Sequence, residues 1–383
     1  MKTQILKIND PEKDIEILKK AAECVASGGL VVFPTETVYG IACKADKKSL
    51  ARLDEVKKRD TDKRYTLHIA GIEKLSDYVP HLSLPQKKLV KSAWPGPLTI
   101  VFQLDKKDIS ENAKLLYKDN TIGIRCPSND IARAFLKLCK FPVVAPSANI
   151  ASKKPAANAK DASRQLDGLV DMLLDGGPCK YKKSSTVVKI SQAGFSVLRE
   201  GVYSETQIRK MLTVNILFVC TGNTCRSPMA EGLARKAIAE KLACGACPAP
   251  SHPTAQNKSG RCGVDQLAQM GYKTGSAGSV AINGIGASPE SIRFCDSRGV
   301  DIFGHKSRRI TPEMLDDADY IFAMSAGHKN DIMRLCPAAE KKCMLLSDSG
   351  DIKDPIGGDF ETYKICGGKI EKAVNKRISE LLK

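Results

Sequence analysis

The 383-residue chain is 42% hydrophobic and 27% charged, and its 60 Lys and Arg against 43 Asp and Glu give a formal charge of +17 at pH 7. This length predicts two domains of ~100–200 residues; no apolar run of ~18 residues could form a membrane-spanning helix, and residues 1–14 lack a signal-peptide core, so we expect a cytoplasmic protein. The charge favours nucleotides, phosphoproteins or RNA as partners, although solvated lysine-rich faces would also explain it, and 5% aromatic residues argue against an extended base-stacking platform.

The first half is predicted to form an α/β sheet. It opens with an amphipathic helix in which apolar residues from Ile15 to Val25 recur at helical spacing, and Gly28-Gly29 ends this helix. Apolar strands follow, with helical segments between most of them, at Leu30 to Phe33, Leu67 to Ala70, Leu98 to Gln103, Ile122 to Arg125, Pro142 to Ala145 and Thr186 to Ile190. We assign residues 1–205 to this domain and 206–213 to a linker, because Tyr203 to Leu212 is typical of a short helix and the next strand begins at Val214.

Polar segments stand where these strands and helices end. Phe33 to Gly40 follows a strand with two hydroxyls and a carboxylate, Lys57-Lys58-Arg59 ends a helix, Trp94 to Thr99 introduces a strand, and Ala145 to Asn149 ends another. A turn or a solvated cluster of charges would explain each segment alone. Ligand sites on open α/β sheets form at strand ends, however, so we expect the four segments to contribute to one site.

In this order the segments resemble the YrdC-like threonylcarbamoyl-AMP synthases over residues ~5–203, with the K-x-R and S-x-N signatures present. The resemblance implies formation of threonylcarbamoyl-AMP from L-threonine, bicarbonate and ATP with release of pyrophosphate, as a step toward threonylcarbamoyladenosine in tRNA. It implies threonine contacts from Thr35, His68, Arg125 and Ser185, and ATP contacts from Lys57, Arg59, Ser147, Asn149 and Arg199.

Adenylate formation places charge on the α-phosphate and on pyrophosphate, so this chemistry needs fixed cations and Mg²⁺ but no covalent nucleophile. A tRNA or a tRNA-modifying protein is a candidate partner. The alternative is that the first half is a non-catalytic module whose basic cleft binds RNA or nucleotides, which leaves the second half as the only enzyme. Threonine-dependent binding of ATP would distinguish the two hypotheses.

The second half opens with the apolar strand Val214 to Val219, the loop Cys220 to Pro228 and the predicted helix Met229 to Ala243. The loop has the spacing C-x5-R-S. A loop between strand and helix that contains Gly222 and Asn223 directs backbone N–H groups to one point at a helix N-terminus, which favours an anion. The sequence therefore predicts a phosphate site, although a buried structural cysteine beside a solvated arginine would also fit C-x5-R.

In such a loop the backbone N–H groups and the helix dipole stabilise a thiolate, so we expect Cys220 to be ionised near neutral pH and nucleophilic. Arg226 would hold two phosphate oxygens as a planar fork, which a lysine could not do. Ser227 would donate a hydrogen bond to the thiolate.

This loop resembles the phosphate loop of low-molecular-weight protein phosphatases, and the resemblance continues through Ser276 to Gly278, His305 to Arg308, the strand Tyr320 to Met324 and Asp354 to Gly358. It implies a parallel sheet flanked by helices over residues 214–383 and hydrolysis of phosphotyrosine or phosphoarginine in proteins through a cysteinyl-phosphate intermediate, without a cofactor. It implies catalytic roles for Cys220, Arg226, Ser227 and the general acid Asp354, and a phosphate loop formed by Thr221, Gly222, Asn223, Thr224 and Cys225. The alternative for Asp354 is a surface Asp-Pro turn.

Two residues bear on the substrate. Tyrosine-specific relatives usually have a larger aliphatic residue at the position of Thr224 and aromatic side chains around that of Ile356. Members with threonine at the first position resemble the bacterial protein-arginine phosphatases, in which the hydroxyl helps to place the attacking water. We therefore hypothesise phosphoarginine as a substrate beside phosphotyrosine.

The 14 cysteines are scattered through a long chain without a signal peptide, which indicates reduced thiols. Cys225 could form a reversible disulfide with Cys220. Cys244, Cys247 and Cys262, with His252 among them, suggest zinc, but no fourth ligand stands at a recognisable spacing, so we predict no metal and a flexible insertion over Leu242 to Lys273.

The alternative for the second half is arsenate reduction. Some members of the same fold use this loop to reduce arsenate and relay electrons through two further cysteines. Ser325 stands where we would expect the first relay cysteine, whereas Cys336 and Cys343 come later. We therefore predict no thioredoxin-coupled arsenate reductase activity, and steady NADPH consumption with arsenate in a coupled assay would contradict this.

Overall fold

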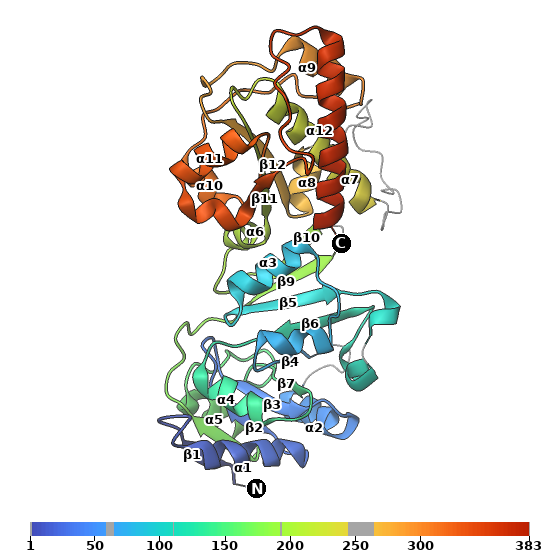
Figure 1. The fold of residues 1–383 in the computed structure, drawn as a ribbon. Coiled ribbons are helices and arrows are strands. Elements are labelled where there is room, and N and C mark those ends of the chain that lie inside the picture. Colours follow the sequence, from blue (N-terminus) through green and yellow to red (C-terminus); the bar gives the residue numbers. More distant parts are fainter. Residues whose placement is uncertain (1, 59–64, 110, 192–193, 244–263, 383) are drawn as a thin grey trace. The chain divides into compact units, whose positions relative to one another are not determined.

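The computed structural model describes residues 2–58, 65–109, 111–191, 194–243 and 264–382. The chain forms two compact units, Met1–Leu82 with Gln86–Leu212, and Thr213–Lys383 with Ser83–Pro85 (Figure 1). Both units have α/β folds, as predicted. The exact boundaries at residues 205 and 214, and the linker between them, stay a prediction.

The first unit is built on a mixed sheet. Its strand order is β1 (Gln4–Lys7), β8 (Met172–Asp175), β2 (Val31–Phe33), β3 (Gly40–Lys44), β7 (Val143–Val144), β4 (Leu67–His68), β6 (Thr121–Arg125), β5 (Leu98–Gln103), β9 (Thr186–Ser191) and β10 (Gly194–Arg199). The pairs β1 with β8, β2 with β8, β4 with β6 and β5 with β9 are parallel, whereas the other neighbours are antiparallel. All six predicted strands are confirmed, and β1, β3, β8 and β10 were not predicted.

Helices of the first unit pack on this sheet. They are α1 (Ile15–Ala26), α2 (Lys47–Lys57), α3 (Leu84–Ala93), α4 (Asp130–Leu138), α5 (Ala159–Leu166) and α6 (Glu205–Leu212), with short 3-10 turns η1 (Ile72–Asp77), η2 (Lys106–Asp108) and η3 (Glu111–Leu116). Helices α1 and α4 share one core, in which the rings of Phe33 and Phe135 lie 5.3 Å apart. A larger core includes Leu53 of α2, Trp94 directly after α3, and Ile208 of α6.

The second unit is a parallel sheet of the order β12 (Tyr272–Gly278), β11 (Val214–Cys220), β13 (Tyr320–Ala323) and β14 (Cys343–Leu345). Its helices are α7 (Arg226–Ala243), α8 (Val264–Gln269), α9 (Pro289–Asp296), α10 (Pro312–Asp317), α11 (Ala326–Leu335) and α12 (Phe360–Leu381), with η4 (Pro337–Lys342) before β14. Alternate residues of β11 enter different cores: Phe218 packs in the core shared with α7, α9 and α12, and Leu217 in the core shared with α10 and α11. Both faces of the sheet are therefore covered.

The predicted flexible insertion Leu242 to Lys273 is partly wrong. Helix α8 and the start of β12 lie within it, and Leu267 and Tyr272 are each only 2% exposed in the core of the second unit. The abundant Ser, Pro, Gly and Lys of the segment concealed these two apolar anchors. Residues 244–263 lie outside the described residues, and with them the zinc candidates Cys244, Cys247, His252 and Cys262.

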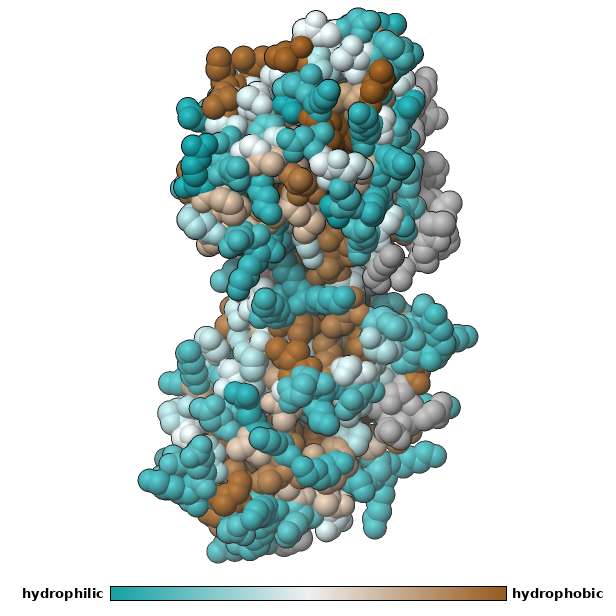
Figure 2. Space-filling model, in the orientation of Figure 1, coloured by the Kyte–Doolittle hydropathy of each residue, from teal (hydrophilic) through white to brown (hydrophobic). Residues whose placement is uncertain are grey.

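Figure 2 shows hydrophilic residues over most of the visible face of each unit. Within the described residues no helix is both long and apolar enough to cross a membrane. The 11 cysteines in the described ranges form no disulfide with one another, and the prediction of reduced thiols stays a prediction.

Two candidate active sites

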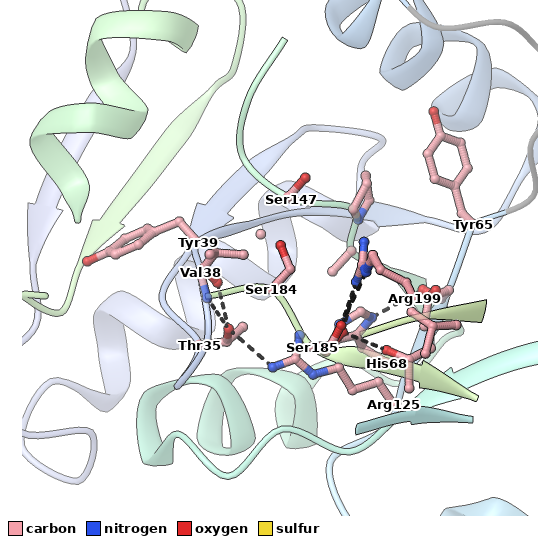
Figure 3. A pocket seen from close by; sticks show the side chains of 16 residues that line it. Thr35, Val38, Tyr39, Tyr65, His68, Arg125, Ser147, Ser184, Ser185 and Arg199 are labelled. Carbon is pink, nitrogen blue, oxygen red and sulfur yellow. Dashed lines mark hydrogen bonds between the residues drawn. The ribbon is translucent and has the colours of Figure 1, made fainter. Parts of the chain in front are cut away.

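The first unit contains a pocket of about 210 Å³ where several strands end (Figure 3). Its walls come from the turn after β2, from β4, β5 and β6, from the turn after β7, and from β9 and β10. Six of the nine residues predicted to bind threonine or ATP line it: Thr35, His68, Arg125, Ser147, Ser185 and Arg199. Lys57 and Asn149 are not among the lining residues, and Arg59 lies outside the described residues. The pocket thus brings together residues that are 164 positions apart in the chain from first to last.

Arg125 is buried at the end of β6. Its Nη2 donates to Glu36 Oε1 at 2.7 Å, to Thr37 Oγ1 at 2.6 Å and to Thr35 Oγ1 at 3.5 Å, and the second oxygen of Glu36 accepts from the Ser128 backbone N–H at 3.1 Å. The buried Nε of Arg125 has no hydrogen-bond partner among the described residues. A guanidinium with an unused N–H in a pocket is suited to a planar carboxylate.

His68 lies on β4 and is also buried. Its Nδ1 is 3.1 Å from the carbonyl oxygen of Thr66, which can only accept, so Nδ1 carries the proton and Nε2 is an acceptor. Burial, together with the positive charge of Arg125, lowers the pKa of His68 to about 3. The ring is therefore neutral at pH 7 and can accept a hydrogen bond from an ammonium or hydroxyl group.

Ser185 and Arg199 form a second polar group in the pocket, drawn with its hydrogen bonds in Figure 3. Arg199 donates through Nε and Nη2 to the Ser185 carbonyl at 3.2 and 2.9 Å, and through Nη2 to Ser185 Oγ at 3.2 Å. Burial and the nearby charge of Arg125 lower the pKa of Arg199 from its usual value. Two guanidinium groups in one pocket favour an anionic ligand. The hydroxyl of Thr99 is 3.0 Å from that of Ser185. Thr99 belongs to the polar segment Trp94 to Thr99, but it was not predicted to contact a ligand.

Lys57, Ser147 and Asn149 hold the turn that follows β7. The ammonium group of Lys57, which is 4% exposed, donates to the carbonyls of Ser147 at 2.5 Å and Asn149 at 2.7 Å. The Asn149 amide donates to the carbonyls of Ile150 and Lys153, each at 2.7 Å, and its oxygen accepts from Ser147 Oγ at 2.5 Å. These side chains therefore shape the rim of the pocket in this structure, and their contacts with ATP stay a prediction.

The predicted phosphate loop lies between β11, which ends at Cys220, and α7, which begins at Arg226. Asn223 has a left-handed backbone (φ 55°) and is fully buried. Its backbone N–H donates to Cys220 Sγ at 3.3 Å, and its side-chain amide donates to Ser227 Oγ and to Ser276 Oγ, each at 2.9 Å. Its side-chain oxygen accepts from the Arg308 backbone N–H at 2.9 Å, and its backbone carbonyl oxygen is 2.7 Å from His305 Nε2. Asn223 thus ties the loop to two of the segments that carry the phosphatase resemblance.

The Cys220 thiol is buried at the base of this loop, with Sγ 2.9 Å from Ser227 Oγ and 3.3 Å from the Asn223 nitrogen. Burial raises the pKa of Cys220, and the Ser227 hydrogen bonds, the Arg226 charge and the Asn223 N–H oppose this effect. The predicted stabilising groups are therefore in place. However, the expectation of a thiol already ionised near neutral pH is not supported in the free loop, because desolvation is the largest effect.

Arg226, the first residue of α7 after the loop, forms an ion pair with Asp354. Arg226 is 4% exposed; its Nη1 donates to the Ile352 carbonyl at 3.0 Å and its Nη2 to Thr221 Oγ1 at 3.2 Å, while Nη2 also bonds Asp354 Oδ2. The buried Nε has no partner among the described residues. The fold therefore brings the predicted general acid beside the predicted phosphate-binding cation.

Several neighbours of the loop were not predicted. His328 Nε2 is 2.8 Å from Thr221 Oγ1, Ser276 Oγ donates to Glu231 Oε2 at 2.6 Å, and Cys225 Sγ is 3.2 Å from Tyr363 Oη. His328, Glu231 and Tyr363 lie on helices, where nothing in the local pattern distinguishes them from ordinary polar residues. Because Cys225 contacts a tyrosine here, its disulfide with Cys220 stays a prediction.

Gly278, at the end of β12, belongs to the predicted Ser276 to Gly278 segment. A Cβ atom there would lie 2.4 Å from the Thr221 carbonyl oxygen and 2.9 Å from the Asn223 nitrogen, closer than real Cβ contacts. This position therefore requires glycine so that the phosphate loop can lie against the strand. Within the described ranges no group of three or more metal-ligating side chains occurs.

Two protein-family models match the chain. The model for the Sua5, YciO and YrdC group, described as telomere recombination, matches residues 23–201. The model for low molecular weight phosphotyrosine protein phosphatase matches residues 215–275 and 263–383. The two matches fall in the two units that contain the two sites.

Relatives of the first unit are threonylcarbamoyl-AMP synthases. The synthase of Pyrococcus abyssi is 33% identical over 196 residues, a match that covers 51% of this chain but only 57% of that relative. A putative threonylcarbamoyl-AMP synthase of Methanocaldococcus jannaschii is 32% identical over 208 residues, 53% of this chain and 95% of that relative. The crystal structure of P. abyssi Sua5 complexed with L-threonine is similar in fold, with a TM-score of 0.50 and 22% identity over 72% of this chain and 92% of that one.

The chain belongs to the threonylcarbamoyl-AMP synthase family through its first unit, and its second unit matches the family model of the low molecular weight phosphotyrosine protein phosphatases.

Proposed function

We propose that the first unit forms threonylcarbamoyl-AMP from L-threonine, bicarbonate and ATP and releases pyrophosphate. The observation that carries this proposal is the pocket in which a buried Arg125, with an unused Nε–H, faces the neutral ring of His68 and the Ser185–Arg199 pair. Membership of the synthase family supports it. A tRNA or a tRNA-modifying protein as the later acceptor stays a prediction.

Each group has a role in this chemistry. Arg125 binds the threonine carboxylate through its Nε edge, and His68 Nε2 accepts from the ammonium or hydroxyl group of threonine. Arg199 lies at the end of β10, and its charge would offset that of the ATP phosphates. Among the described residues that line the pocket there is no carboxylate, so we assign no protein ligand to the expected Mg²⁺; this ion would enter with the ATP phosphates.

The test follows pyrophosphate release with ATP, bicarbonate and threonine, and omits each substrate in turn. We expect release only when all three are present. If the first unit is instead a non-catalytic nucleotide-binding or RNA-binding module, isothermal titration will detect binding of ATP that does not depend on threonine, and no pyrophosphate will form. That result would reject the synthase proposal.

We propose that the second unit hydrolyses phosphorylated side chains in proteins. When the phosphate group binds, the proton of the Cys220 thiol passes to the carboxylate of Asp354. Cys220 Sγ then attacks phosphorus as the thiolate, the bond from phosphorus to the leaving oxygen or nitrogen breaks, and Asp354 gives this proton to the leaving atom. Water then attacks the thiophosphate, Asp354 takes its proton, and phosphate and free Cys220 are restored. The observation that carries this proposal is the thiol of Cys220 within a loop that also holds Arg226, Ser227 and Asp354.

The ion pair of Arg226 with Asp354 indicates how substrate enters. Both Nη atoms of Arg226 are bonded in the free loop, whereas Nε is unpaired among the described residues. A phosphate group that binds Arg226 through Nε and Nη2 displaces Asp354 from Nη2. The displaced carboxyl group is then above the phosphate, where the leaving atom needs a proton.

Asp354→Asn is expected to keep phosphate binding and to slow the release of poor leaving groups. The amide cannot donate a proton as an acid does, and an activated aryl phosphate needs little protonation of its leaving group. We expect kcat to fall roughly 10²-fold or more for an alkyl or phenyl phosphate and distinctly less for para-nitrophenyl phosphate. Equal slowing of both substrates would show that Asp354 is not the acid.

For substrate choice we propose phosphoarginine beside phosphotyrosine. Thr224 is partly exposed in the loop, and Ile356 is 71% exposed, so its aliphatic side chain offers no aromatic wall to clamp a phenyl ring. We expect Thr224→Ile to move the ratio of kcat/KM values toward phosphotyrosine, measured on matched phosphoarginine and phosphotyrosine peptides. A wild type that prefers phosphotyrosine, with a ratio that this substitution leaves unchanged, would reject the phosphoarginine hypothesis.

A further inference from the structure

His328 is a buried histidine beside the phosphate loop that no step above uses. It lies in the first turn of α11, where Ser325 caps the helix by accepting from the His328 N–H at 3.3 Å. Its ring is held at both nitrogens: Nδ1 is 2.7 Å from Ser325 Oγ, and Nε2 is 2.8 Å from Thr221 Oγ1. Thr221 in turn accepts from Arg226 Nη2 at 3.2 Å. A continuous chain of hydrogen bonds therefore runs from the cap of α11 to the guanidinium.

The other two contacts of Arg226 come from a single segment. Ile352 and Asp354 both precede α12, and they bind Nη1 and Nη2 respectively. Asp354 must leave Nη2 when phosphate binds, so that segment loses one of its two contacts with Arg226 during each reaction cycle. Thr221 belongs to the phosphate loop itself and is braced by His328 from α11, so its contact does not depend on the position of Asp354.

We infer that His328 is a positioning residue for the phosphatase reaction, which holds the guanidinium of Arg226 in the phosphate-binding orientation through the Thr221 hydroxyl. This inference rests on the proposed phosphatase function. Burial and the charge of Arg226 lower the pKa of His328, against the opposing effect of Asp331, Asp354 and Asp351. The ring is accordingly neutral at pH 7, so it acts through hydrogen bonds, and a neutral amide of the right length can replace it.

Two amide substitutions separate the two ends of the ring. In His328→Gln the terminal amide reaches the position of imidazole Nε2 and keeps the bond to Thr221. In His328→Asn the amide reaches only the position of Nδ1 and keeps the bond to Ser325. A role in capping or packing alone predicts that Asn is tolerated at least as well as Gln, whereas the positioning role predicts the reverse.

The experiment measures kcat and KM with para-nitrophenyl phosphate, and binding of inorganic phosphate by titration calorimetry, on the full chain. We expect His328→Asn to lower kcat/KM and to weaken phosphate binding, each by roughly 10-fold or more, because small displacements of a binding group are costly. We expect His328→Gln to restore most of both quantities. Similar values for Asn and Gln, whether both wild-type or both impaired, would overturn the inference.

Thr221→Val tests the same bond from its other end if the His328 variants fold poorly. It removes the hydroxyl but keeps the shape of the side chain, and we expect the same loss of phosphate binding, with no further loss when it is combined with His328→Asn. Additive losses would overturn the inference. Phosphate binding is measured without turnover, so the two proposals can fail separately. A wild-type protein that binds phosphate but hydrolyses no substrate would reject the proposed phosphatase function. The phosphate affinities of the His328 and Thr221 variants would still test whether His328 positions Arg226.

Discussion

Cys220→Ser should abolish phosphatase turnover and leave adenylate formation unchanged. A serine hydroxyl in this loop keeps the bonds to Ser227 and Asn223, but it does not ionise near neutral pH and is a far weaker nucleophile. We expect kcat for para-nitrophenyl phosphate to fall roughly 10⁴-fold or more, as when other covalent enzymes lose their nucleophile. Inorganic phosphate should still bind, because Arg226 and the loop N–H groups remain.

Cys336→Ser is the matched control for this prediction. Cys336 is a buried thiol of the same unit whose Sγ lies 3.5 Å from Asp316 Oδ1, a contact that a serine hydroxyl can keep. We expect near wild-type kinetics from it. The pyrophosphate assay on Cys220→Ser tests the separation of the two sites. If a folded Cys220→Ser protein loses both activities equally, the assignment of two independent domains is wrong.

Arg125→Ala should have the largest effect in the first unit, on stability and on activity together. Arg125 and Glu36 form an ion pair 2.7 Å long whose side chains are 7% and 4% exposed. Removal of one partner leaves Glu36 as an uncompensated buried charge, which costs about 3–5 kcal/mol of unfolding free energy. The same change removes the proposed partner of the threonine carboxylate, so threonine-dependent pyrophosphate release should fall roughly 10²-fold or more.

The double variant Arg125→Ala with Glu36→Gln separates the two effects. A neutral amide at position 36 is less costly to bury than an unpaired carboxylate, so we expect the thermal unfolding midpoint to recover in part. Pyrophosphate release should not recover. Arg164→Ala is the surface control, because the Arg164 side chain is 67% exposed and its ion pair with Asp161 contributes little. A stable Arg125→Ala protein with unchanged threonine saturation would remove Arg125 from the binding site.

Local pattern was enough for much of the fold. The strand of residues 214–219, the loop after it and the helix that follows were all predicted, because apolar periodicity and turn residues act over short distances along the chain. Strands β1, β3, β8 and β10 were missed. Strands β1 and β10 carry exposed residues, and β3 and β8 are short, with five and four residues. Short strands of this kind are hard to distinguish from loops by local pattern.

Arg59 and the cysteines of residues 244–263 lie outside the described residues. Lys57 and Asn149 illustrate a different limit of the sequence. Their residue types suggested contacts with phosphate, yet each bonds to backbone carbonyls of the turn after β7. Whether a buried polar side chain meets a ligand or the chain itself depends on the path of the backbone around it.

The sequence by itself determined the two families, the α/β character of both units and most of the candidate residues, because the spacing within Cys220 to Ser227 and the segments at strand ends are local features. Only the tertiary structure decided which groups meet: Glu36 with Arg125 across 89 positions, Thr221 with His328 across 107, and Arg226 with Asp354 across 128. It also decided that burial raises the pKa of Cys220. The order of the strands in a sheet decides which distant residues meet, and the helices that cover the sheet decide how deeply a side chain is buried. No local pattern of residues encodes the strand order or the packing of the helices.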